Sequence, residues 1–126
     1  MKDLTVELVL AIHDRAMARE TGDTRLLSEA GIHQMVFRAN LIPELFPRAA
    51  FILYSLIAYP VFREGNNRTA FDVTRQVLTS EGYQLQPENS SIKALMGGIL
   101  SFTVEPEDIE EWLFQNVKKA GDPAQN

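Results

Sequence analysis

The longest apolar run of the chain, AAFILYSLIAY at residues 49–59, constrains the fold more than any other feature. A helix over about 48–59 would be apolar nearly all round, so it must be covered on every side. The run is too short to cross a bilayer and contains Ser55 and Tyr59, which favours a buried core helix over a membrane span. The chain is therefore predicted to fold around this one central helix.

Helical spacing of apolar residues, together with start and stop signals, predicts five further helices. Thr5 and Ser28 are suitable N-caps, Gly82 is suited to ending a helix, and Pro106 fits a first helical position. The helices before the central one are expected over about 5–20 and 28–39. Those after it are expected over about 67–81, from the PENSS caps to about 100, and from 106 to about 117.

No segment has the pattern of a strand, so the expected fold class is all-α, a single-domain six-helix bundle over residues 1–120. Residues 121–126 are expected to form a flexible tail. The segment NLIPELFP at 40–47 contains two prolines and is predicted to be a surface flap. Its apolar side chains either dock a target peptide or an inhibitor, or fold back on the central helix.

Composition excludes several classes of function. The chain has 126 residues and a net charge of −5, which argues against broad binding to nucleic acid. It contains no cysteine, so disulfides, thiol catalysis and zinc–thiolate sites are excluded. The N-terminus lacks the layout of a signal peptide, and we expect a cytoplasmic protein that does not associate with membranes.

The polar segment PVFREGNNRT at 60–69, directly after the apolar run, has the chemistry of an anion site. Gly65 can adopt positive φ, and the helix that follows presents free N–H groups and the positive end of its dipole. Arg68 can donate forked hydrogen bonds to phosphate, and Asn66 can donate from its amide. Glu64 is a suitable ligand for Mg²⁺.

The same spacing also fits a purely structural turn. In that interpretation Asn66 caps the following helix, while Glu64 and Arg68 form a surface ion pair. Residue spacing leaves both interpretations open.

The segment VFREGNNRTA resembles the signature of the Fic/Doc family, H-x-F-x-[DE]-[AG]-N-[GK]-R. Five residues match it in register, namely Phe62, Glu64, Gly65, Asn66 and Arg68. The upstream stretch LTVELVLAIHDRAMARETGDTRLLSEAGI is similar to the N-terminal part of the death-on-curing branch of that family. The resemblance covers about residues 4–82.

This resemblance implies an ATP-dependent transferase that moves phosphate or AMP to a protein hydroxyl. Glu64 would hold Mg²⁺, and Gly65, Asn66, Asn67 and Arg68 would hold the phosphates of ATP or another nucleotide. The implied target is a protein of the translation machinery or similar. A separate antitoxin or inhibitor protein is also implied, because the autoinhibitory motif of some family members is missing from this chain.

The chain departs from the family pattern at the general base, where Pro60 stands in place of the histidine. Asn67 replaces the family's Gly or Lys, and Phe71 replaces a second arginine of many AMP transferases. His13 and His33 fall on other helices and are interpreted as structural or surface residues. The resemblance thus implies a loop that binds nucleotide phosphates, with impaired transfer. The alternatives are an active kinase or AMP transferase with another base, and a non-catalytic protein-binding module.

Overall fold

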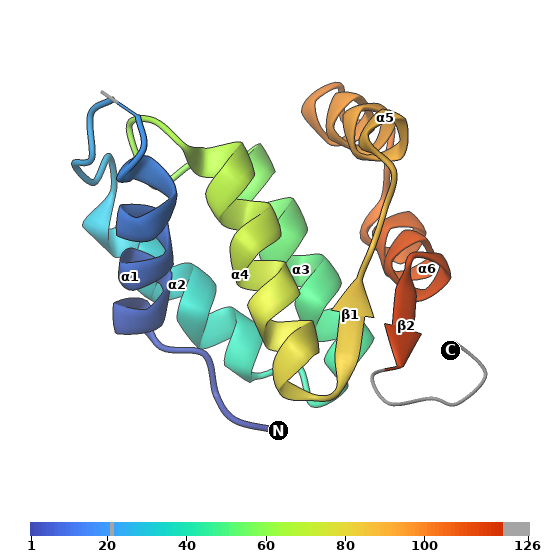
Figure 1. Ribbon diagram of the computed structural model, residues 1–126. Helices are drawn as coiled ribbons and strands as arrows, with labels where there is room; N and C mark the ends of the chain where they lie inside the picture. The colour runs from blue at the N-terminus through green and yellow to red at the C-terminus, as the bar shows by residue number, and fades with distance from the viewer. Residues whose placement is uncertain (21, 120–126) are drawn as a thin grey trace.

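The computed structural model describes residues 1–20 and 22–119 and shows six helices and two short strands within them (Figure 1). The predicted tail at 121–126 lies outside these residues. The elements in chain order are α1 (Val6–Met17), α2 (Glu29–Asn40), α3 (Leu45–Ala58), α4 (Asn66–Ser80), β1 (Tyr83–Leu85), α5 (Asn89–Leu100), α6 (Pro106–Gln115) and β2 (Val117–Lys119).

Helix α3 is the centre of the fold, as the apolar run predicts. It packs against α2, α4, α5 and α6, and Ile52, Leu53 and Leu56 are almost completely buried. Figure 1 shows α3 and α4 side by side, with α1 and α2 to one side and α5 and α6 to the other. The all-α bundle around a central apolar helix is therefore confirmed. None of the helices in residues 1–20 and 22–119 is long and apolar enough to cross a membrane.

The prediction that α3 is covered on every side is wrong for one face. Phe51, Tyr54 and Ala58 are only half-buried, and their spacing places them on the same side of the helix. This side contacts less of the surrounding bundle than the sequence pattern suggests.

The predicted helix starts are confirmed where side chains cap the first turn. The Thr5 hydroxyl accepts from the N–H of Leu8 at 3.1 Å, and the Ser28 hydroxyl accepts from that of Gly31 at 2.9 Å. Pro106 is the first residue of α6, where its missing N–H removes no helical hydrogen bond.

The expectation that the chain has no strands is wrong. Strands β1 and β2 pair in antiparallel register, with Tyr83 opposite Lys119 and Leu85 opposite Val117. Gly82, at φ 90°, turns the chain sharply between α4 and β1. Each strand has only three residues, too few to give a periodic signal.

A buried arginine holds the turn between α2 and α3, part of the segment predicted as a flap. The Arg48 guanidinium donates to the backbone carbonyls of Ile42 at 2.8 Å, Asn40 at 3.1 Å and Lys2 at 3.3 Å. Arg48 therefore ties the end of α2 and the N-terminal segment to α3.

The rest of the predicted flap belongs to α3, which begins at Leu45, three residues earlier than expected. The ring of Phe46 packs edge-on against Tyr83 and Phe114, at centroid distances of 5.2 and 5.5 Å. Leu41 remains 67% exposed. Residues 40–47 therefore form a turn held by Arg48, followed by the first turn of α3, which packs through Phe46.

Candidate functional site

The polar loop begins where α3 ends. Ala58 is the last helical residue, and the N–H of Tyr59 still bonds the carbonyl of Ser55 at 2.9 Å. Pro60 has no N–H with which to continue the helical ladder. Pro60 and Tyr59 are both exposed, whereas Phe62, two residues on, is buried and anchors the loop.

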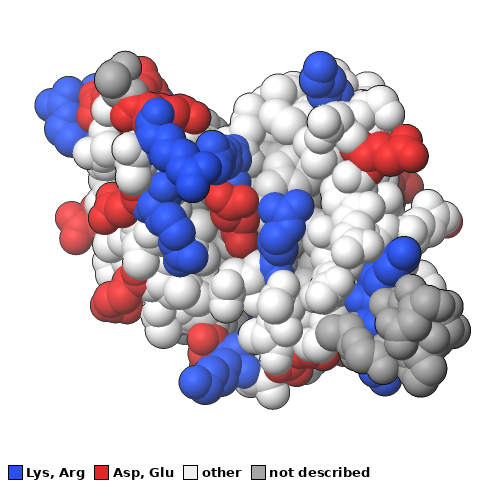
Figure 2. Space-filling view, in the orientation of Figure 1, with Lys and Arg blue, Asp and Glu red and all other residues white. Residues whose placement is uncertain are grey.

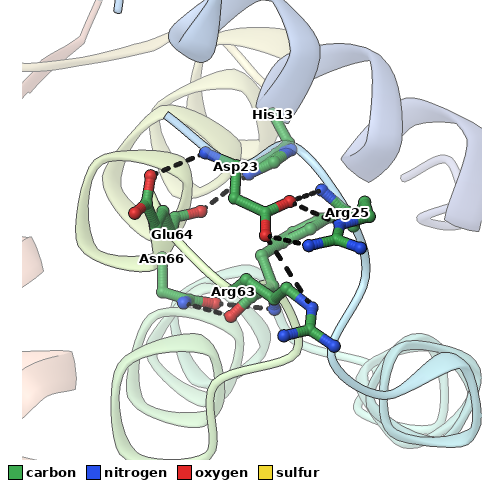
Figure 3. A network of polar contacts seen from close by, with 7 residues as sticks. His13, Asp23, Arg25, Arg63, Glu64 and Asn66 are labelled. Carbon is green, nitrogen blue, oxygen red and sulfur yellow. Dashed lines mark hydrogen bonds and ion pairs between the residues drawn. The ribbon is translucent and has the colours of Figure 1, made fainter. Parts of the chain in front are cut away.

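Asn66 braces the loop from inside. Its side-chain oxygen accepts from the N–H groups of Val61 at 3.2 Å and Phe62 at 3.0 Å, and its side-chain nitrogen donates to the Phe62 carbonyl at 2.7 Å (Figure 3). These three bonds use the side-chain oxygen and one of the two amide N–H groups, so the second amide N–H and the Asn66 backbone N–H have no acceptor among the described residues. The predicted role of this side chain as a phosphate donor therefore stays a prediction, carried by its second N–H.

The segment 22–28 packs along the loop, a position that the sequence did not indicate. The N–H groups of Leu27 and Ser28 both donate to the carbonyl of Val61, at 2.8 and 3.1 Å. The N–H of Asp23 donates to the Glu64 carboxylate at 2.7 Å (Figure 3). One oxygen of the predicted metal ligand is thus engaged by the neighbouring segment.

His13 fixes the loop from α1. Its ring is buried and stacks on Phe62 with a centroid distance of 3.6 Å and an interplanar angle of 3°. Its Nε2 lies 2.8 Å from the Glu64 carbonyl, so Nε2 must carry the proton and donate. Because C=O and N–H point in opposite directions in a trans peptide, this bond aims the Gly65 N–H away from His13. His13 therefore orients the loop backbone through Nε2.

The sequence contained a weak signal for this role. His13 lies four residues after Val9 and beside Ile12, both buried, at the edge of the apolar stripe of α1. A stripe alone could not identify Phe62, 49 positions further along the chain, as the partner.

Gly65 leads the loop into α4 in a left-handed conformation, with φ 79° and ψ 16°. A Cβ atom added to Gly65 would lie 2.5 Å from Met17 Sδ and 3.4 Å from His13 Nε2. The first intrahelical bond runs from the Thr69 N–H to the Gly65 carbonyl. Within the part of the chain that the structure describes, the backbone N–H groups of residues 65–68 have no hydrogen-bond acceptor. The predicted glycine turn with free amides is therefore present.

Arg68 lies in the first turn of α4 and its side chain is half exposed. It forms long ion pairs with Glu20, at 3.8 Å, and with Asp72, at 3.7 Å. In the purely structural interpretation, Arg68 pairs with Glu64 and Asn66 caps α4. In the structure, Arg68 pairs with Glu20 and Asp72 instead, and the N-cap of α4 is Gly65. Basic and acidic side chains intermingle on the surface of α1 and α4 in Figure 2.

Asp23 carries the strongest ion pair beside the loop. Its carboxylate accepts two hydrogen bonds from the Arg25 guanidinium, at 2.8 and 3.0 Å, and lies 3.9 Å from Arg63. The hydrogen bonds from the side chain and backbone of Arg25 lower the pKa of Asp23 from 3.8 to about 2. Asp23 is thus ionised at neutral pH and forms ion pairs with both Arg25 and Arg63.

The acidic residues of the loop fit a metal only in part. The described chain contains no group of three or more His, Asp or Glu side chains that could hold a metal ion by itself. Glu64 has one oxygen without a hydrogen bond to the described residues. Mg²⁺ is often held by one or two carboxylates with phosphates and water completing the shell. Glu64 therefore has one carboxylate oxygen with which it could contribute to a metal site.

Thr69, one turn into α4, is fully buried, and its hydroxyl has no hydrogen-bond partner among the described residues. An unsatisfied buried hydroxyl costs about 1–3 kcal/mol. We expect Thr69→Val to raise the free energy of unfolding by about 1 kcal/mol, measured by urea denaturation. Thr74→Val is the matched control in the same helix, because the Thr74 hydroxyl donates to the Ala70 carbonyl at 2.7 Å. A gain in stability for Thr74→Val equal to that for Thr69→Val would contradict this account.

Comparison of the sequence with models of protein families finds no match, and a search of curated proteins finds none either. The resemblance to the Fic/Doc family therefore rests on the loop motif and the upstream stretch, over about residues 4–82.

Proposed function

We propose that the FREGNNR loop binds the phosphates of a nucleotide such as ATP together with Mg²⁺, as in the Fic/Doc family that the motif resembles. The observation that carries this proposal is the left-handed Gly65, which directs the chain into α4 and leaves the amides of residues 65–68 without acceptors. Such an arrangement binds anions through aligned N–H groups and the helix dipole. Arg68, at the same helix end, can add a charge-assisted bond.

The charge balance around the loop supports a nucleotide bound with its metal. Arg68 is shared between Glu20 and Asp72, and the Asp23 carboxylate holds Arg25 and Arg63. These carboxylates offset the arginines, so a bare triphosphate meets little net positive charge. Mg²⁺ held by Glu64 would supply the missing charge, and we therefore expect chelation of Mg²⁺ to weaken binding.

Catalysis is proposed to be impaired because no base stands at the expected position. Pro60 has no titratable group, and the Nε2 of His13 is engaged by the Glu64 carbonyl. A positioned general base contributes about 10²–10⁴-fold to rate. The target of any residual transfer, in this proposal, is a protein hydroxyl of the translation machinery or similar. A separate inhibitor protein and a cytoplasmic location belong to the same proposal.

Isothermal titration with ATP and Mg²⁺ tests the loop. We expect Arg68→Ala to weaken binding about 10-fold, the loss of one charge-assisted hydrogen bond. Arg75→Ala is the matched control, because Arg75 also pairs with Asp72, at 3.5 Å, two turns further along α4. It is expected to leave the affinity unchanged. No binding by the unmodified chain, or equal affinities for the chain and Arg68→Ala, would show that the phosphate proposal is wrong.

The same titration, together with a label-transfer assay, separates the alternatives. A protein-binding module without a nucleotide role does not bind ATP. An active kinase or AMP transferase binds ATP and also transfers label to a host protein at a rate that Glu64→Ala abolishes.

A further inference from the structure

A groove of about 790 Å³ runs between α2 and α3, along the half-buried side of α3. Phe51, Tyr54 and Ala58 line it from α3, and Gly31 and Met35 line it from α2. On each helix these residues recur at helical spacing, so each helix contributes one continuous face. The groove therefore lies along two neighbouring helices and is elongated in their direction.

The rim of the groove is open, and apolar apart from the exposed side chains of Gln34 and Arg38. Leu27 is 57% exposed and Tyr59 is 63% exposed, and both line it. Small-molecule sites usually enclose most of their ligand, which such an open rim does not do. A space between two helices is suited to the apolar face of a third helix, whose opposite face stays in solvent.

The charge of the residues that line the groove indicates which charge a partner should carry. Arg38 is the one charged residue that lines the groove, and no Asp or Glu lines it among the described residues. Arg38 forms no ion pair with any carboxylate that the structure describes. This positive lining belongs to a chain with a net charge of −5, so it is a local feature. An acidic side chain on the partner would complement it.

We propose that the α2–α3 groove binds an amphipathic helix of another protein, with an apolar stripe against Leu27, Phe51 and Tyr54 and an Asp or Glu paired with Arg38. Tyr59 and Pro60 also line the groove and lead directly into the loop. The proposal does not depend on nucleotide binding, because none of the residues 62–68 lines the groove.

Fluorescence anisotropy of the full chain with a labelled helical peptide of about 18 residues tests this proposal. The peptide carries leucines at i, i+3, i+4 and i+7 spacing with glutamates beside the stripe, and a second peptide replaces those glutamates with lysines. We expect saturable binding of the glutamate peptide. Leu27→Asp should weaken it at least about 10-fold, and Arg38→Glu should weaken it about 5–10-fold and shift the preference to the lysine peptide.

Two matched controls keep the test specific. Lys93→Glu makes the same change in net charge on α5, and Leu41→Asp places the same residue on an exposed leucine outside the groove lining. Both are expected to bind the glutamate peptide like the unmodified chain. The proposal is overturned if neither peptide binds saturably, or if Lys93→Glu weakens binding as much as Arg38→Glu. It is also overturned if the chain self-associates and Leu27→Asp separates the copies, since the occupant is then a second copy of this chain.

Discussion

Gly65→Ala is expected to lower the free energy of unfolding by about 2–5 kcal/mol and to abolish ATP binding. Two costs add at this position. An alanine held at φ 79° is strained by about 1–2 kcal/mol. Its Cβ would also lie 2.5 Å from the sulfur of buried Met17, and such overpacking costs about 1–3 kcal/mol. Urea denaturation measures the loss of stability, and titration with ATP and Mg²⁺ measures the loss of the site.

Gly82→Ala separates the two costs. Gly82 has a similar conformation, with φ 90°, but an added Cβ would meet no atom within 4 Å. It should therefore show only the backbone cost, about 1–2 kcal/mol, and retain ATP binding. Equal losses of stability for the two variants would mean that Met17 moves aside freely and that overpacking adds no cost at residue 65.

Pro60→His is expected to raise label transfer from ATP to a host protein by roughly 10²-fold over the unmodified chain. The substitution places an imidazole of ordinary pKa near 6.5 two residues before Phe62, where the family motif has its base. Pro60 is exposed, so the new ring meets solvent without displacing core side chains. The expected recovery is partial, because the change also restores an N–H and frees φ beyond the end of α3. Transfer is measured with ATP labelled at either phosphate end.

Pro60→Ala is the matched control, since it restores the same N–H and backbone freedom without a base. It should transfer no more label than the unmodified chain. Robust transfer by the unmodified chain, unchanged in Pro60→His and abolished in Glu64→Ala, would identify an active enzyme with a different base. If neither the unmodified chain nor Pro60→His transfers label although both bind ATP, the result would favour a binding module that keeps the nucleotide as a structural ligand.

The sequence by itself determined the features that depend on neighbouring residues. The apolar run at 49–59 predicted a central core helix, which α3 is as far as Ala58, and Thr5, Ser28 and Pro106 begin helices through bonds or geometry within one turn. Gly65 before a helix likewise predicted a left-handed turn with free amides. These predictions succeed because capping, helical periodicity and φ preference act over at most a few residues.

Only the tertiary structure decided which distant segments meet. His13 stacks on Phe62, and the N–H of Asp23 donates to Glu64, across separations of 49 and 41 residues. The pairing of β1 with β2 joins residues more than 30 positions apart, so three-residue strands form where the sequence shows no strand pattern. Arg48 appears in the sequence as a lone charge at the start of an apolar run, yet its donors tie three backbone carbonyls together. Side-chain partners of this kind follow from how the helices pack, because the packing brings residues distant in sequence within hydrogen-bond distance.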